Sequence, residues 1–319
     1  MKKRIFAALL AVGMALAGCS STTTQGQKYV AVIAKSVNSD FFRNMKNGVE
    51  SAATEYNVRV TFEGPENEED YLSQNALIAN AVKNGADAIL LSSIDYHKTN
   101  DAVSEAVKNG VKVITVDSGI SSELVSQFIG TDNRAAGKTA GLAAVSGFAS
   151  EAKIFIGIVN CTEETDNGKQ REEGFREAIA SVPNAEITAI AVTDSNTESA
   201  KEGALKLLRE YSQINVLVGF NEWLTLGIGE AIRESDAAQR VRGIGFDTNV
   251  LSVSMLETGE MDALVVQNPF AIGYLGVMNA ARLIGGETLD SPEIYTEVLV
   301  VNKENMFDED VQKLLFRFQ

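Results

Sequence analysis

Short apolar, β-branched runs alternate with stretches of helical periodicity along most of the chain. After the first run, Phe42, Met45 and Val49 recur at the spacing of one helix face. The apolar runs are Tyr29–Ala34, Val58–Phe62, Asp87–Ser92, Val111–Val116, Lys153–Val159, Glu186–Val192, Ile214–Phe220, Val241–Phe246 and Ala263–Gln267. Near-continuous apolar strands that each lead into a helix indicate parallel sheets covered on both faces, so the predicted fold class is α/β.

The alternating pattern falls into two series that resemble each other. Gly85–Ser92 has the same pattern as Gln213–Phe220, and Gly110–Asp117 has the same pattern as Arg240–Asp247. A chain of 319 residues also usually divides its core between two domains. We therefore predict two doubly wound parallel-sheet lobes that face one another.

The N-terminus has the pattern of an export signal. Basic residues 2–4 precede the apolar run Ile5–Ala17, which is too short to span a bilayer. The run ends in Leu16-Ala17-Gly18-Cys19, which resembles the lipobox of bacterial lipoprotein signal peptides. The resemblance implies that residues 1–18 are removed and that Cys19 carries the lipid, with 19–27 as a flexible tether to the outside of the cell membrane. An ordinary secretory signal with an accidental cysteine is the alternative.

Composition excludes several classes of function. The chain has 28 basic and 43 acidic side chains and a formal net charge of −15, which argues against a nucleic-acid partner. With the single histidine His97, a zinc site or a histidine-based triad is not expected, and we predict no metal. The pairs Gly227-x-Gly229 and Gly243-x-Gly245 lack the remaining glycines of a dinucleotide loop, so we predict no cofactor and no enzymatic activity.

Hydrogen-bonding side chains follow the predicted strands. In open parallel sheets, ligands collect beyond the carboxyl ends of the strands. For any single residue a helix cap or turn is the commoner role, so only the whole set predicts a polar cleft. The set comprises Asn38, Ser39, Ser92, Ser93, Asp117, Asn160, Asn221, Asp247 and Gln267.

A known family has similar motifs in the same order. Asn38-Ser39-Asp40-Phe41-Phe42 resembles the Asn-x-Pro-Phe-Phe signature of ribose-type sugar-binding proteins, the receptors of ABC importers with the type I periplasmic-binding-protein fold. The motifs that follow are Val113–Asp117, Gln170–Phe175, Asn221-Glu222, Gly243–Asp247 and Val266–Pro269. The resemblance covers essentially the whole chain after the export signal.

That family implies two lobes that close around a ligand on a hinge of three crossings. By similarity the crossings lie near Thr131, Gln267 and Thr296. The N-terminal lobe would then comprise 28–131 plus 268–296, and the C-terminal lobe 132–267 plus 297–319.

The resemblance also implies which residues bind the ligand. Carboxylates accept sugar hydroxyl protons, arginine and amides donate, and aromatic rings suit the apolar faces of a sugar. By matched position, Asp117, Arg171, Asn221, Asp247 and Gln267 would hydrogen-bond the sugar, Phe41 and Phe42 would stack on it, and Asn38 would join the site. One of the two phenylalanines is expected to belong to the core.

Three residues depart from the family pattern and put ribose itself in doubt. Ser118 stands where the ribose pattern has an arginine, Ser195 where many relatives have an aromatic residue, and Asp40 where proline is usual.

The chain is predicted to be a monomeric, extracytoplasmic lipoprotein. Its predicted function is to capture a small polar solute, most simply a monosaccharide, for an ABC permease. The alternative is a receptor of the same fold that signals to a histidine kinase or chemoreceptor. Sugar-responsive repressors share the fold, but they need a basic DNA-binding module and have no export signal.

Overall fold

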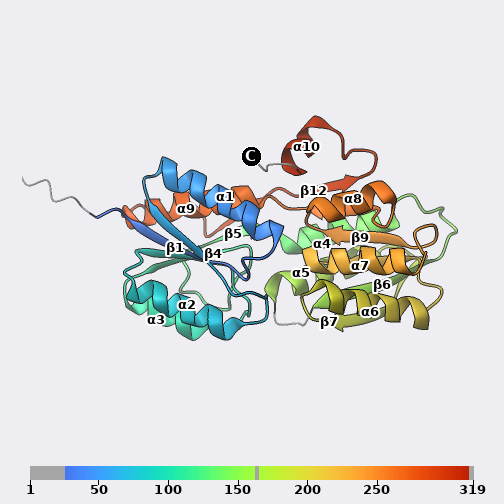
Figure 1. Cartoon of the computed structure of the whole chain (residues 1–319), viewed down its shortest axis with the longest axis horizontal. Helices are drawn as coiled ribbons and strands as arrows, with labels where there is room; N and C mark the ends of the chain where they lie inside the picture. The colour runs from blue at the N-terminus through green and yellow to red at the C-terminus, as the bar shows by residue number, and fades with distance from the viewer. Residues whose placement is uncertain (1–25, 162–164, 316–319) are drawn as a thin grey trace, which may run out of the picture.

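The computed structural model describes residues 26–161 and 165–315, which form two lobes side by side along the longest axis of the molecule (Figure 1). Each lobe contains one six-stranded sheet with helices on both faces. The prediction of two parallel-sheet α/β lobes is therefore confirmed. The proposed export signal and Cys19 lie outside the described residues.

The first lobe has the strand order β11-β5-β4-β3-β1-β2, and every pairing in it is parallel. Its strands are β1 (Tyr29–Ile33), β2 (Arg59–Glu63), β3 (Ala88–Leu91), β4 (Lys112–Val116), β5 (Gln127–Thr131) and β11 (Glu293–Thr296), and its helices are α1 (Asp40–Glu55), α2 (Tyr71–Lys83), α3 (Asn100–Lys108) and α9 (Pro269–Ile284). Val30 and Val32 of β1 pack in the cluster that includes α1 and α9, whereas Ala31 and Ile33 pack in the cluster with α2 and α3. Successive side chains point to opposite faces, so an uninterrupted apolar strand supplies both cores.

The second lobe has the corresponding order β12-β10-β9-β8-β6-β7. Its strands are β6 (Ile154–Cys161), β7 (Ala185–Thr193), β8 (Val216–Gly219), β9 (Arg242–Phe246), β10 (Ala263–Val266) and β12 (Leu299–Asn302), and its helices are α4 (Asn133–Val145), α5 (Asp166–Ala180), α6 (Thr197–Glu210), α7 (Glu222–Glu234), α8 (Val250–Thr258) and α10 (Glu309–Leu315). Its one antiparallel pairing among the described strands joins β12 to β10 at the edge. The two strand pairs that echo each other in sequence, β3–β4 and β8–β9, occupy equivalent places in the two sheets.

The chain passes between the lobes three times. It crosses after β5 at Thr131, after β10 at Gln267, and between β11 and β12, which are separated by Glu297 and Val298. The third crossing is short, so the chain goes almost directly from the edge of one sheet to the edge of the other. β11 is parallel to its neighbour β5, and β12 is antiparallel to its neighbour β10. No helix within the described ranges is long and apolar enough to cross a membrane.

Candidate ligand-binding cleft

One cavity between the lobes collects the residues that follow the strand ends. The empty space of this cavity, including the open solvent at its mouth, is about 300 Å³. Of the residues predicted to bind the ligand, all but Asn38 line it, whereas Ser92, Ser93 and Asn160 of the wider strand-end set do not. The lining residues are Lys35, Ser39, Phe41, Phe42, Glu68, Asp117, Asn167, Arg171, Asn221, Glu222, Asp247 and Gln267.

Two aspartates face the cavity from opposite lobes. Asp117 follows β4 and Asp247 follows β9, and both have left-handed backbone conformations with φ of 61° and 64°. Aspartate tolerates this region better than most residues, and such backbone strain concentrates at functional sites. Asp117 accepts a 2.7 Å hydrogen bond from Ser92 Oγ, and Asp247 accepts one of 2.6 Å from Gln267 Nε2. Burial raises the pKa of Asp247, against the opposing attraction of Arg171.

Arg171 lies in the second turn of α5, lines the cavity, and has one guanidinium nitrogen without a partner among the described residues. Its Nε donates to Asn133 Oδ1 at 2.9 Å, its Nη1 donates to the carbonyl of Phe220 at 2.7 Å, and its guanidinium lies over the ring of Phe246. The side chain is 1% exposed, yet Nη2 has no hydrogen-bond partner among the described residues. An unsatisfied buried donor is costly, so this Nη2 is the clearest indication of a ligand.

The helix α4 fixes the backbone of Arg171. Gly137 of α4 lies so close to α5 that a Cβ there would overlap the carbonyl oxygen of Arg171. Only glycine permits this approach, so the close packing of α4 on α5 fixes the backbone from which the Arg171 side chain extends.

The aromatic pair lies at the start of α1. Phe41 and Phe42 contact edge to face, with ring centroids 5.2 Å apart, and both line the cavity. They are 7% and 3% exposed and also belong to the core cluster of the first lobe. The expected division into one core ring and one cavity ring is therefore not observed: each ring has both roles.

Asn38 does not point into the cavity. It is exposed, and its Nδ2 donates to the carbonyl of Glu66 at 2.8 Å. The neighbouring Ser39 lines the cavity instead, while its Oγ caps α1 by accepting from Phe42 N. The prediction for Asn38 thus has no support in the geometry, because the turn into α1 rotates the side chain to the surface.

Two amides combine a structural role with a place in the cavity wall. Asn221 caps α7 by accepting from Leu224 N, and its Nδ2 donates to Ser195 Oγ at 2.9 Å. Gln267 accepts from Thr131 Oγ1 at 2.8 Å and donates to Asp247. A helix cap and a ligand-site residue are alternative interpretations for such side chains. Asn221 caps α7 and also lines the cavity.

Lys35 is a cavity residue that the sequence pattern did not indicate. It is 2% exposed, and its Nζ lies 3.1 Å from Asn167 Oδ1 and 3.7 Å from Asp117 Oδ2. Asn167 belongs to the second lobe and also donates to Asp117 Oδ1 at 3.5 Å. Lys35 therefore supplies a cation near Asp117, where Ser118 lacks the family's arginine.

Glu68 reaches the cavity from the loop between β2 and α2. Trp223 Nε1 donates to its Oε1 at 3.2 Å, and Ser195 Oγ lies 3.5 Å from Oε2. Both partners belong to the second lobe, and Ser195 N also donates to Glu69. Desolvation raises the pKa of Glu68, with Lys35 opposing the shift. Ser195, which stands where many relatives have an aromatic residue, thus contacts Glu68 and Glu69 of this acidic loop.

Glu222 crosses between the lobes in the other direction. It is 6% exposed, and its two oxygens accept from Asp40 N and Phe41 N at 3.3 Å each. These amides open α1 of the first lobe, where the helix dipole favours a carboxylate. Asn249 Nδ2 donates to the same carboxylate at 2.9 Å. Burial nevertheless raises the pKa of Glu222 to about 7.

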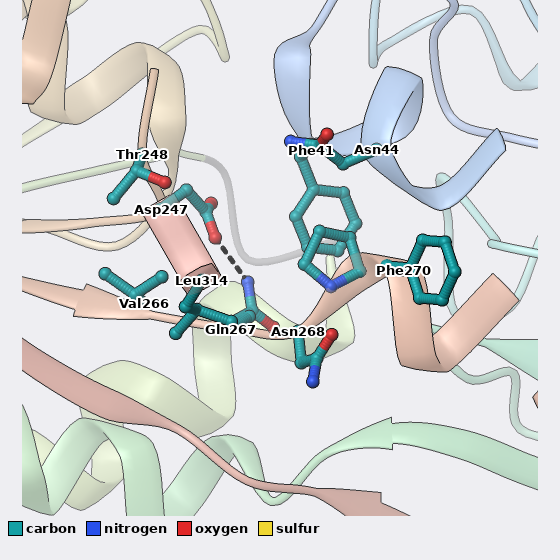
Figure 2. A pocket seen from close by; sticks show the side chains of 10 residues that line it. Phe41, Asn44, Asp247, Thr248, Val266, Gln267, Asn268, Phe270 and Leu314 are labelled. Carbon is teal, nitrogen blue, oxygen red and sulfur yellow. Dashed lines mark hydrogen bonds between the residues drawn. The ribbon is translucent and has the colours of Figure 1, made fainter. Parts of the chain in front are cut away.

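A second pocket adjoins the cavity at the crossing after β10 (Figure 2). It shares Phe41, Asp247 and Gln267 with the cavity and adds Asn44, Phe270 and Leu314. Figure 2 shows Phe41 on one side and the Gln267–Asp247 hydrogen bond on the other; a residue at the second crossing between the lobes thus directly contacts a cavity carboxylate.

One residue of the predicted polar set has another role. Asn160, the second-last residue of β6, lies outside this cavity, and its Nδ2 donates to Glu172 at 2.7 Å. Glu172 is half-buried between Asn160 and Arg176. No group of metal-ligating side chains occurs among the described residues.

Comparison with known proteins identifies the family. The model of the periplasmic binding protein domain matches residues 30–288, most of the chain. The chain belongs to this family. Its relatives are binding and transport proteins rather than enzymes, which agrees with the absence of a predicted catalytic group.

This periplasmic binding protein is similar to several sugar-binding proteins. It is 24% identical over 306 residues to the D-ribose/D-allose-binding protein of Pseudomonas aeruginosa, covering 90% of this chain and 94% of that one. The solved carbohydrate-transporter solute-binding protein of Agrobacterium radiobacter, in complex with D-arabinose, is 26% identical with a TM-score of 0.87, covering 91% and 99%. A sugar transporter of Clostridium phytofermentans is 33% identical with a TM-score of 0.79, covering 87% and 100%. The predicted type I periplasmic-binding-protein fold is confirmed.

Proposed function

We propose that this protein captures a monosaccharide in the interlobe cavity and delivers it to an ABC permease. The observation that carries the proposal is the unpartnered Nη2 of Arg171, buried in a cavity that also holds Asp117 and Asp247. Sugar hydroxyls donate and accept together, so one ligand can satisfy both the guanidinium and the carboxylates.

The remaining lining residues fit the same ligand. Phe41 and Phe42 offer apolar surface for a sugar face, and Asn221 and Gln267 offer amides at its edge. The relatives named above bind or transport sugars, and the D-arabinose complex has the same fold. Lys35 and the acidic loop differ from the pattern of a ribose site, so we do not propose ribose as the preferred sugar.

A thermal-shift screen tests the ligand class. The chain from Lys28 onward should be stabilised by particular pentoses, hexoses or deoxyhexoses, because a ligand at about 100 times its Kd adds ~2.7 kcal/mol of stability. Polyols, nucleosides and amino acids serve as controls. Stabilisation by one of those classes and by no carbohydrate would contradict the proposal.

Uptake measurements test the transport role. Cells that lack the gene should lose high-affinity uptake of the identified sugar, and a plasmid copy should restore it. Normal uptake combined with lost sugar-induced gene expression would instead mark the protein as a sensor for a membrane kinase or chemoreceptor.

We also propose that the protein is a monomer anchored outside the cell membrane through a lipid on Cys19. The support is the lipobox-like segment Leu16–Cys19, which follows a basic and then an apolar stretch. Cys19→Ser should release the protein from the membrane fraction or leave its signal peptide uncleaved. Unchanged membrane association with unchanged lipid labelling would contradict the anchor.

A further inference from the structure

The charges that line the cavity do not balance. Its carboxylates are Glu68, Asp117, Glu222 and Asp247, and its cations are Lys35 and Arg171. Lys35 lies 3.7 Å from Asp117, and Arg171 is the cation that attracts Asp247. Each of the two cations therefore already interacts electrostatically with one of the two strand-end aspartates.

Glu68 and Glu222 have neutral hydrogen-bond donors and, within the described part of the chain, no directly paired cation. Glu68 accepts from an indole and a hydroxyl, and Glu222 accepts from two backbone amides and the amide of Asn249. Lys35 attracts Glu68 only at longer range. These two glutamates extend from opposite lobes, so closure of the lobes brings their negative charges to the same ligand.

We propose that this cleft is a charge filter, which accepts uncharged sugars and rejects sugar acids and sugar phosphates, and that Glu68 and Glu222 impose the selection. The inference rests on the proposed sugar-binding function and deepens it. At a separation of ~6 Å and an effective dielectric constant of about 20, each unpaired carboxylate weakens binding of an anionic ligand by roughly 100-fold. The free Nη2 of Arg171 offers a donor to a hydroxyl oxygen, but the charge of Arg171 is already opposed by Asp247.

The directions of the pKa shifts of the cavity carboxyl groups agree with this excess of negative charge. Burial raises the pKa of Glu68, Glu222 and Asp247, and in each case a neighbouring carboxylate adds to the shift. A site that already disfavours its own ionised carboxylates disfavours a further one on the ligand.

Isothermal titration at pH 8, where Glu222 is ionised, tests the filter on the mature protein. The probes are matched pairs: D-galactose with D-galacturonate, D-glucose with D-glucuronate, and D-ribose with ribose 5-phosphate. In whichever pair the neutral sugar binds, we expect the anion to bind at least ~100-fold more weakly. Glu68→Gln and Glu222→Gln should each reduce that ratio by about 10-fold or more, and the ratio is insensitive to general losses in closure because both ligands share them.

Glu230→Gln is the matched control. Glu230 lies on α7 like Glu222, but it faces solvent near Lys201, so the ratio should not change. Equal binding of a sugar and its acid, or an unchanged ratio in both glutamine variants, would overturn the charge filter while leaving sugar binding in place. Binding of an anion alone would also overturn it. If neither member of any pair binds, and the wider carbohydrate screen is negative, the proposed sugar-binding function fails and the filter fails with it.

Discussion

The two lobes have the same scaffold. Their strand orders correspond position by position, and β4 and β9 are each followed directly by an aspartate with a φ near 60°. Asp117 N donates to β5 and Asp247 N donates to β10, so even the hydrogen bonds that hold the two turns are equivalent. Equivalent turns on facing sheets explain how two carboxylates come to share one cavity.

The lobes differ in the side chains that complete the cavity. The first lobe contributes the aromatic pair at α1 and Lys35 and Glu68 from loops, whereas the second contributes Arg171 and amides from the first turns of helices. The second lobe therefore supplies most of its polar and charged groups, Glu222 among them, from the N-terminal turns of helices, and the first supplies apolar surface and charges on loops. The comparison suggests that the common scaffold sets where a ligand lies, and that the side chains added by each lobe, Glu68 from a loop and Glu222 from a helix among them, set which ligand it is.

Removing Arg171 should cause the largest loss of affinity. Arg171→Ala deletes the unpartnered Nη2 donor that we assign to the ligand and also removes the cation that attracts the carboxylate of Asp247. Hydrogen bonds to charged groups contribute about 1.5–3 kcal/mol, so we expect roughly 10- to 150-fold weaker binding by isothermal titration.

Arg176→Ala on the same helix is the control, because Arg176 is exposed and bonds only Glu172 among the described residues. Its affinity should equal that of the parent. Arg171→Lys separates charge from geometry, because lysine cannot reproduce the guanidinium contacts to Asn133 and Phe220. Parent-like affinity in Arg171→Ala would mean that the second lobe does not hold the ligand through this guanidinium.

The equivalence of the two aspartates can be tested directly. Asp117→Asn and Asp247→Asn keep the shape and tolerate the left-handed backbone, but each loses a charged acceptor. We expect each to weaken binding by roughly 10-fold. Asp236→Asn is the control, since Asp236 has a φ of 49° in an exposed turn. A large loss in one variant and none in the other would show that the matching turns do not have matching roles.

Most of the fold and the centre of the site could be predicted from the sequence. Apolar runs such as Val111–Val116 are unambiguous because both faces of each strand are buried. Asp117 and Asp247 could be placed because they directly follow such runs. The strands β5, β11 and β12 were not predicted, because β11 and β12 are four residues long and partly exposed, and β5 begins with a polar residue.

The residues that cross the cleft could not be predicted in the same way. Glu68 lies in a loop among other acidic residues, and no local pattern distinguishes it from a solvated charge. Glu222 follows a predicted site residue, but its role depends on a helix N-terminus more than 180 residues away. Only the packing of the lobes brings such groups together, so these contacts are properties of the tertiary structure.

Affinity should depend on pH through Glu222. In the closed cleft its pKa is about 7, against 4.5 for an ordinary glutamate, so the closed state binds more protons between these values. Closure and affinity are therefore favoured as pH falls through this window and decrease as pH rises to about 7.5, with little change above. The cavity carboxyls Glu68 and Asp247 have pKa values raised in the same direction, while Lys35 and Arg171 oppose them.

A difference of up to ~10-fold in Kd is expected between pH 6 and pH 8 for an uncharged sugar. Titration at pH 6.5 in buffers of different ionisation enthalpy should reveal proton uptake on binding. Glu222→Gln should reduce that uptake, and Glu230→Gln should not. A Kd that is independent of pH, with no proton uptake, would show that Glu222 is not buried by closure.

The contact between Trp223 and Glu68 should have the smallest energetic effect and provide the most direct view of the two lobes meeting. Trp223 is the single tryptophan of the chain, so its fluorescence reports only on this position. Trp223→Phe keeps an aromatic ring against the core of the second lobe but loses the hydrogen bond to a half-buried carboxylate that Ser195 still contacts. We expect a loss of only about 0.5–1 kcal/mol, or two- to fivefold in affinity, because water can replace the lost donor.

In the parent, saturating sugar should shift the emission as the indole leaves solvent for Glu68, and Glu68→Ala should diminish the shift without abolishing binding. An emission spectrum that sugar leaves unchanged, despite tight binding by calorimetry, would mean that the lobes are already in contact at this point before the ligand enters.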